Sequence, residues 1–255
     1  MFRGLEVLDG GMGTLLQERG LRAGETPEDW NVERPDDIAA IHRAYVEAGA
    51  EVIYTNTFGA NRLKYHGRHS LEEVIRCGLS IANEVKVEGV GVERNFPLVA
   101  LDLGPTGKLL KPAGDLDFDD AVAAFAETIK IATSALHLHL HSTPPSPDLI
   151  VIETMGDILE LKAAVIAAKE TCDLPVWATV AVDADGKLLT GGSVECVSAL
   201  LESLGVEAYG FNCGLGPDRM LPHVERLAKV STKPIIVKPN AGLPSIVGGR
   251  TVFSF

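Results

Sequence analysis

The sequence predicts an α/β fold, and within that class a (β/α)8 TIM barrel that lacks its eighth strand. Short apolar runs alternate with longer segments of helical period, as in repeated βα units. The connections from helix to strand are short. Nearly every apolar run also ends in a cluster of polar or small residues. An open doubly wound sheet would carry such clusters only beside its switch point, so their presence at nearly every strand end favours the barrel.

Seven apolar runs are expected to be strands, because each is nearly continuously apolar, as parallel strands covered on both faces are. They are Leu5–Asp9, Val52–Thr57, Leu98–Asp102, Asp148–Glu153, Pro175–Val180, Glu207–Cys213 and Pro234–Lys238. A barrel needs an eighth strand, and only residues 239–255 follow the last run. We therefore expect a barrel that is incomplete at its C-terminal end.

Six segments of helical period lie between these runs, and most of them begin near Asp, Ser or Pro. They are Pro35–Ala48, Leu71–Glu88, Phe118–His137, Asp157–Glu170, Val194–Leu204 and Pro217–Val230. No linker interrupts the alternation, so one domain spanning residues 1–255 is expected.

The charge and composition of the chain exclude several classes of partner. The sequence has 23 Lys and Arg against 35 Asp and Glu, a formal net charge of −12, so the average surface repels nucleic acid and anionic membranes. It has no run long enough for a secretory signal or a membrane span. Its four cysteines form no CxxC pair, and we expect reduced thiols and a cytoplasmic location.

Two carboxylates are candidates for binding a cationic amine at the mouth of the barrel. Asp9 ends the first apolar run and is followed by Gly10 and Gly11, whose backbone N–H groups could hold an anion. Glu153 ends the fourth run and should face Asp9 across the barrel mouth. The alternative readings are a tight turn that needs glycine conformations and a structural or helix-capping carboxylate.

Cys213 is the cysteine that ends a predicted strand, where a thiolate could act as a nucleophile or as a zinc ligand. A buried, inert thiol is the alternative. The alternating histidines His137, His139 and His141 suggest a metal site, but they precede a Pro-rich stretch on the opposite side of the barrel and are better explained as a solvated loop.

The motifs at successive strand ends, taken together, resemble the homocysteine S-methyltransferase family, and most closely the homocysteine-binding modules of cobalamin-dependent methionine synthases. The resemblance spans nearly the whole chain. It is carried by Asp9-Gly-Gly-Met-Gly-Thr, Asn31 with Pro35, Tyr54-Thr-Asn-Thr-Phe-Gly-Ala-Asn, Gly104-Pro-Thr-Gly, Ile152-Glu-Thr-Met, Gly210-Phe-Asn-Cys and Val237-Lys-Pro-Asn-Ala-Gly-Leu-Pro.

This resemblance implies methyl transfer to the thiol of homocysteine, which gives methionine. In the family, three cysteines bind a zinc ion that ionises the substrate thiol. Cys213 matches the first of these cysteines and would therefore be both metal ligand and catalytic residue. The other two belong to a Gly-Gly-Cys-Cys-Gly motif after the eighth strand, which this sequence does not contain.

The same resemblance implies the roles of the substrate-binding residues. Asp9 and Glu153 would hold the homocysteine ammonium, and the N–H groups around Gly10 and Gly11 its carboxylate. Asn212 would support the strand that carries the metal ligand. The remaining pocket residues, near the incoming methyl donor, would be Thr57 and Phe58.

The methyl donor is partly indicated by Gly59. Betaine-using relatives have an aromatic residue directly after the phenylalanine of this motif, where it cages a quaternary ammonium, and here that residue is Gly59. We therefore expect methylcobalamin as the donor, carried by a corrinoid-binding domain or protein, with a folate-binding domain as a further possible partner.

The incomplete zinc site leaves a second hypothesis open, namely a catalytically inactive fragment or a substrate-binding or interaction module. A weaker alternative is a barrel lyase or aldolase that uses Lys238 as a Schiff base.

Overall fold

The computed structural model describes residues 4–88, 97–134, 145–241, 243–247 and 250–254. Their contacts divide the chain into two compact units. Unit 1 comprises Met1–Leu103 with Ala124–Ile150, and unit 2 comprises Gly104–Ala123 with Val151–Phe255. The prediction of a single domain remains an expectation, and the two units are described separately below.

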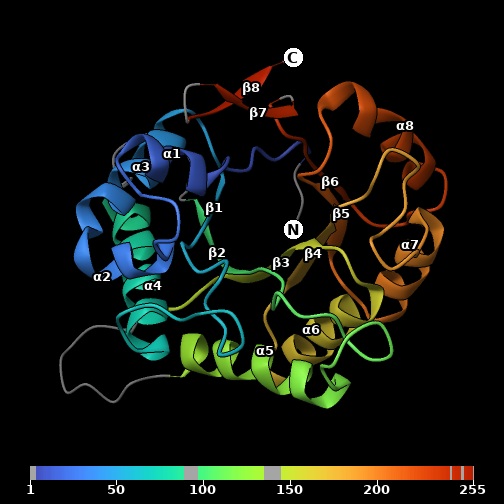
Figure 1. Ribbon diagram of the computed structural model, residues 1–255, viewed down its shortest axis with the longest axis horizontal. Helices are drawn as coiled ribbons and strands as arrows, with labels where there is room; N and C mark the ends of the chain where they lie inside the picture. The colour runs from blue at the N-terminus through green and yellow to red at the C-terminus, as the bar shows by residue number, and fades with distance from the viewer. Residues whose placement is uncertain (1–3, 89–96, 135–144, 242, 248–249, 255) are drawn as a thin grey trace. The chain divides into compact units, whose positions relative to one another are not determined.

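Six strands form one sheet, and they follow one another in chain order, β1-β2-β3-β4-β5-β6 (Figure 1). Their bounds are Val52–Tyr54, Leu98–Leu103, Leu149–Met155, Val176–Val180, Ala208–Asn212 and Ile235–Lys238. Pairing is parallel between β1 and β2, between β4 and β5, and between β5 and β6. Helices separate the successive strands, so the predicted α/β class with a parallel sheet is confirmed.

The helices agree closely with the sequence prediction. The long ones are α3 (Pro35–Glu47), α4 (Leu71–Glu88), α5 (Phe118–Thr133), α6 (Ile158–Thr171), α7 (Val194–Ser203) and α8 (Pro217–Ala228). Two begin at side-chain caps, because Asp157 accepts a hydrogen bond from the Leu159 N–H and Ser193 accepts one from the Cys196 N–H. These caps explain why the boundaries were readable from the sequence.

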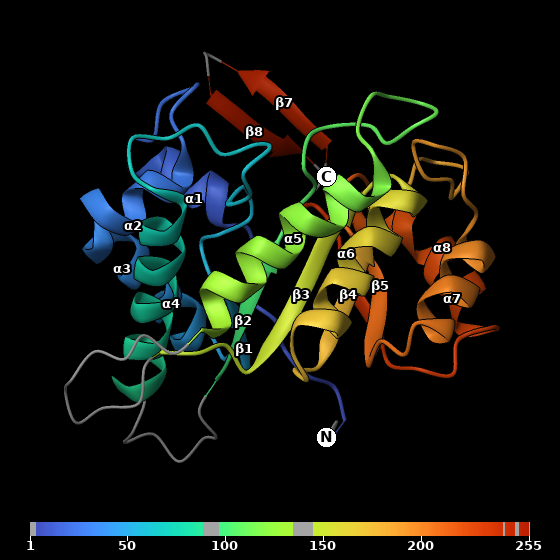
Figure 2. The same ribbon diagram turned by 90° about the horizontal axis from the view of Figure 1, so that it is seen from below.

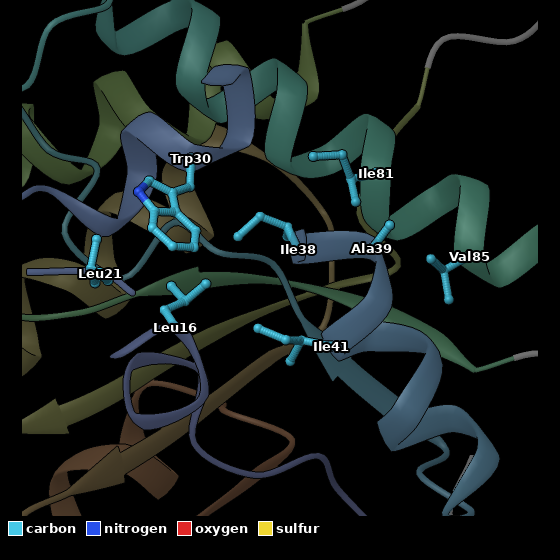
Figure 3. Packing of buried hydrophobic residues seen from close by; sticks show 8 residues of the cluster. All are labelled: Leu16, Leu21, Trp30, Ile38, Ala39, Ile41, Ile81 and Val85. Atoms are coloured by element: carbon cyan, nitrogen blue, oxygen red, sulfur yellow. The ribbon is translucent and has the colours of Figure 1, made fainter. Parts of the chain in front are cut away.

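The helical side of unit 1 is held by a cluster of apolar side chains (Figure 3). The cluster joins α1 (Met12–Glu18), α2 (Trp30–Glu33), α3 and α4, and consists of Leu16, Leu21, Trp30, Ile38, Ala39, Ile41, Ile81 and Val85. The guanidinium of Arg34 covers the Trp30 ring at 3.8 Å from its centroid, which shields the edge of the cluster.

In unit 2, α7 and α8 lie side by side (Figure 2). Helix α8 also contacts β5 and β6. Residues 239–241 leave β6, and the chain then forms an antiparallel pair, β7 (Leu243–Val247) with β8 (Arg250–Ser254). Within the described residues, no helix is both long enough and apolar enough to cross a bilayer.

Some local features differ from the sequence prediction, and others fall outside the described residues. The run Leu5–Asp9 forms only a parallel bridge between Leu8 and Val52, because its side chains at Leu5 and Val7 are exposed and cannot anchor a buried strand. The short helices α1 and α2 and the 3-10 turn Pro27–Asp29 were not predicted, nor was the β7–β8 pair. His137, His139 and His141, like the end of the helix predicted over Phe118–His137, lie outside the described residues.

His42 on α3 gives unit 1 a pH-dependent stability. Its side chain is fully buried, neither ring nitrogen has a hydrogen-bond partner, and burial lowers its pKa from 6.5 to about 4. The unfolded chain therefore binds a proton that the folded chain rejects. The stability that comes from neutral His42 is complete above pH 6.5 and is lost as the pH falls from 6.5 towards 4.

We expect His42→Leu to flatten the dependence of unfolding free energy on pH between 6.5 and 4, by an amount on the order of a few kcal/mol. Urea unfolding at about pH 7.5, 5.5 and 4.5 measures how the unfolding free energy of each protein depends on pH. His66, which is exposed, supplies the control substitution His66→Gln. A His42→Leu protein that loses stability on acidification as steeply as the parent would contradict the prediction.

Candidate functional site

A polar cluster in unit 2 centres on the side-chain amide of Asn212, the last residue of β5. Its Nδ2 donates to Thr154 Oγ1 at 2.7 Å and to Glu153 Oε2 at 3.3 Å, and lies 3.6 Å from the Cys213 sulfur. Its Oδ1 accepts from the Thr154 N–H at 2.8 Å. Asn212 is buried, so these contacts replace water for an amide that would otherwise be costly to bury.

Two residues of this cluster have a backbone conformation that is uncommon outside glycine. Thr154, near the end of β3, has φ 61°, and Cys213, directly after β5, has φ 56°. Both conformations are held by hydrogen bonds. The Asn212 oxygen accepts from Thr154 N–H, and the Cys213 N–H donates to Lys238 O at 3.0 Å. Strained backbone of this kind concentrates at functional sites, where it aims a side chain in a direction that a regular strand does not allow.

The third strand of the cluster is β6, which ends at Lys238. The Lys238 Nζ lies 3.9 Å from Glu153 Oε2, and the two side chains are 17% and 15% exposed. The ends of β3, β5 and β6 therefore bring a carboxylate, an amide, a hydroxyl, a thiol and an ammonium group together. The hydroxyl of Thr154 lies 4.0 Å from the Cys213 sulfur.

In unit 1, Asp9 is buried and is held by the backbone of β1. Its Oδ2 accepts from the Tyr54 N–H at 2.6 Å, and its own N–H donates to Val52 O at 3.0 Å. Gly10 and Gly11 follow it and lead into α1. The Tyr45 hydroxyl donates to Gly11 O at 3.1 Å, and a side chain at position 10 would collide with the Tyr45 ring. Glycine at position 10 therefore keeps the backbone after Asp9 close to α3.

Thr57 lies in a hydrogen-bonded chain that connects the ends of β1 and β2. Its hydroxyl donates to Asp102 O at 2.8 Å and lies 2.7 Å from the Thr55 hydroxyl, which accepts from the Asp102 N–H at 3.1 Å. The chain is buried. It therefore fixes the backbone from which Phe58 and Gly59 follow.

The segment after Thr57 is held by a hydrogen bond to the buried carboxylate of Glu28. Glu28 Oε1 accepts from the Gly59 N–H at 2.6 Å, and an added Cβ at Gly59 would lie 2.7 Å from that oxygen. Burial raises the pKa of Glu28, opposed in part by its backbone hydrogen bonds and by the positive charge of Lys64. The Lys64 ammonium also covers the Phe58 ring at 4.3 Å from its centroid.

The structure thus brings Glu153, Asn212 and Cys213 together in unit 2, while the other candidates lie in unit 1, at Asp9, Gly10, Gly11, Thr57 and Phe58. The roles assigned to all of them stay predictions. Thr154 and Glu28 received no role from the sequence. Thr154 stood in a quoted motif next to Glu153, but a contact to Asn212 across the sheet leaves no signal in the spacing.

The described residues hold no group of three or more His, Cys, Asp and Glu side chains that could bind a metal ion. All four cysteines are free thiols. Three of them do not lie at the carboxyl end of a strand, since Cys77 lies on α4, Cys196 on α7 and Cys172 directly after α6. Burial raises the pKa of Cys77, which makes it a poor thiolate donor. Cys213, by contrast, directly follows β5, and its role in chemistry stays a prediction.

Comparison with known proteins identifies the family. The model of the homocysteine S-methyltransferase family matches residues 6–253. The chain belongs to this family. It is 35% identical over 261 residues to methionine synthase of Mycobacterium leprae and 34% identical over 259 residues to that of Mycobacterium tuberculosis, in both cases over 96% of this chain. It spans only 20% and 21% of these relatives' own length.

The fold is likewise shared with a solved family member. The metallated form of the homocysteine methyltransferase MmuM from Escherichia coli superposes with a TM-score of 0.77 over 93% of this chain and 84% of that chain, at 21% identity. The predicted TIM-barrel class with an incomplete barrel is confirmed by this likeness and by the six parallel strands.

We expect Asn212→Ala to lower the free energy of unfolding by about 1–3 kcal/mol, because the Thr154 N–H loses its acceptor in a buried setting. Urea denaturation measures this loss. Asn83 on α4 offers a control amide, whose Nδ2 bonds Leu79 O within its own helix. If Asn212→Ala cost no more than Asn83→Ala, Asn212 would not organise the cluster.

We expect Gly59→Ala to destabilise the protein by about 1–3 kcal/mol, because the new methyl group overlaps Glu28 Oε1. Gly13→Ala is the matched control, since no atom lies within 4 Å of a Cβ at that position. Thermal melts compare the two variants. Equal melting temperatures for the two variants would contradict the prediction, because they would show that Glu28 or the segment after Thr57 shifts at little cost to make room for the methyl group.

Proposed function

We propose that the chain binds homocysteine and transfers a methyl group to its thiol, giving methionine. Membership of the homocysteine S-methyltransferase family supports this most directly. The cluster of Glu153, Asn212 and Cys213 adds support, because it puts a carboxylate and a thiol beside each other at strand ends, where barrel enzymes carry their active sites.

The resemblance to the family supplies the roles of the residues, and they suit the chemistry of a zwitterionic amino thiol. Glu153 binds the substrate ammonium, and Asn212 keeps the Glu153 carboxylate in place through its Nδ2. Asp9 is a second ammonium-binding carboxylate, held by the Tyr54 N–H. The N–H groups around Gly10 and Gly11 bind the substrate carboxylate.

In the reaction the substrate thiol releases its proton to solvent and the sulfur lone pair forms a bond to the methyl carbon. The bond from that carbon to the donor breaks, and the donor keeps its electron pair. Thr57 and Phe58 would shape the pocket on the donor side. Among the described contacts, Thr57 has the rigid hydrogen-bonded setting that such a role needs.

The described residues do not supply the full set of ligands that zinc dependence would require. A zinc ion that also binds substrate needs three protein ligands. Cys213 supplies one, and no group of three ligand side chains lies in the described part of the chain. These residues therefore do not fit zinc by themselves.

Methylcobalamin is the methyl donor that we propose, carried by a corrinoid-binding domain or protein, with a folate-binding domain or protein as a further partner. The methionine synthases to which the chain is similar are about five times longer than the matched region, so there is room in such proteins for further domains. Glu28 adds a steric reason against a caged quaternary ammonium donor, because it fills the space behind Gly59 that a side chain would need. A cytoplasmic location fits the free thiols.

The second candidate is a catalytically inactive fragment or a substrate-binding or interaction module, favoured by the incomplete ligand set. Metal content discriminates between the two. Zinc bound by the purified protein, at a content that Cys213→Ser lowers, would support the methyltransferase. A protein that purifies without zinc would support the inactive module, and a zinc content unchanged by Cys213→Ser would contradict the ligand role of Cys213.

Incubation with zinc, homocysteine and methylcobalamin tests the activity itself. We expect methionine to form, and we expect Cys213→Ser to reduce its rate by about 100-fold or more, as loss of a residue acting at the reacting atoms does. Cys196→Ser, at an exposed helical thiol, is the control. A folded protein without turnover under these conditions would refute the proposal for this chain.

A further inference from the structure

Thr154 has a backbone conformation that β-branched residues rarely adopt. Its φ is 61°, in the left-handed region, where a branch at Cβ crowds the backbone. The residue lies inside a strand, one position before the end of β3. Glycine or asparagine would take this conformation with less strain, so a threonine at this position costs stability. A use for its side chain would explain why the strain is kept.

The left-handed backbone at Thr154 lets two consecutive residues of β3 reach the same side chain. In a regular strand, neighbouring side chains point to opposite faces of the sheet. Here Glu153 Oε2 and Thr154 Oγ1 both accept from Asn212 Nδ2, at 3.3 and 2.7 Å. The Thr154 N–H donates to Asn212 Oδ1 at 2.8 Å. These two bonds with Asn212 fix the Thr154 hydroxyl beside the Glu153 carboxylate.

The bond from Asn212 leaves the hydroxyl proton of Thr154 available for a second contact. A hydroxyl group has one donor and two acceptor lone pairs, and Asn212 uses one of the lone pairs. Among the described residues, the acceptor for the proton is the Cys213 sulfur, at 4.0 Å. This distance is long for a hydrogen bond, so the O–H group can turn to a closer acceptor. Thr154 is half-buried, and a ligand can therefore reach its hydroxyl.

Thr154 lies between the two residues that the proposed function assigns to the ends of the substrate. Glu153 precedes it in the chain and takes the ammonium, whereas Cys213 belongs to the sulfur end. An amino thiol that extends from Glu153 towards Cys213 therefore passes the Thr154 hydroxyl. A thiolate accepts a hydrogen bond strongly because it is charged, whereas the sulfur of a thioether is a weak acceptor.

We propose that Thr154 is a specificity-determining residue that donates a hydrogen bond to the substrate sulfur, and that it favours the thiolate of homocysteine over the thioether of methionine. This inference rests on the proposed function, because it adds a contact to the substrate named there. Asn212 holds the hydroxyl in place, and the left-handed backbone puts it beside Glu153. The same preference weakens the binding of the product once the sulfur is methylated.

Binding of three amino acids tests the proposal without turnover and without metal. Homocysteine has a thiol, methionine a thioether, and 2-aminobutyrate no sulfur. Calorimetry at about pH 8.5, where roughly half of a free thiol is ionised, gives the dissociation constants when a reductant is present. The proteins are the parent, Thr154→Val and Thr154→Ser. Thr133→Val is the matched control, because the Thr133 hydroxyl donates to Ile129 O within α5.

We expect Thr154→Val to weaken homocysteine binding by about 10-fold, as loss of a hydrogen bond to a charged group does. This variant keeps the branched shape and lacks the hydroxyl, so its binding of methionine and 2-aminobutyrate should change by less than about twofold. Thr154→Ser keeps the hydroxyl and should bind homocysteine as the parent does. Thr133→Val should bind all three as the parent does, and circular dichroism verifies that each variant is folded.

The outcomes separate this inference from the proposed function. If Thr154→Val binds homocysteine as tightly as the parent, or weakens all three ligands to the same extent, Thr154 does not recognise the sulfur. The inference is then wrong and the proposed function stands. Weak homocysteine binding by Thr154→Ser would also contradict the inference, because the hydroxyl would not be the group that matters. If the folded parent binds neither homocysteine nor methionine, the proposed function itself fails.

Discussion

The carboxyl ends of parallel strands lie at one edge of a sheet. In unit 2 the buried amide of Asn212 connects the polar groups at these ends by hydrogen bonds. Asn212 contacts Glu153 and Thr154 from β3 and the sulfur of the residue that follows it. Because an amide has both donors and an acceptor, it can bind the Thr154 N–H and the Glu153 carboxylate at the same time. A carboxylate or an apolar residue in its place could not do both. Glu153 and Thr154 are thus both bonded to this one side chain, whereas the Cys213 backbone is held by the Lys238 carbonyl.

Most of the fold was predictable because the local signals agree with one another. The bounds of α4 follow the hydrophobic period and match the sequence prediction at both ends, and the Asp157 and Ser193 caps define the starts of α6 and α7. The strands were visible as apolar runs because both of their faces are covered. The strand predicted over Leu5–Asp9 was wrong because composition does not reveal exposure, and the side chains of Leu5 and Val7 are exposed.

The site was predictable at the level of single residues and less so at the level of contacts. Cys213 and Glu153 became candidates because each ends an apolar run of the sequence and because their motifs resemble a family. The hydrogen bonds between Thr154 and Asn212 were not predicted, because they depend on a left-handed backbone at Thr154 that only the folded chain shows. Glu28 illustrates the same limit. A carboxylate before Trp30 reads as the acidic start of a helix, and its burial behind Gly59 comes from tertiary packing.

The left-handed backbone at Cys213 has a consequence for descendants of this sequence. At φ 56° a β-branched side chain is disfavoured, whereas glycine and asparagine are tolerated. Valine or isoleucine at this position would therefore strain the backbone after β5, although both are common in neighbouring strands. A sequence that replaces this cysteine and keeps the same backbone should carry glycine or asparagine directly after the fifth strand.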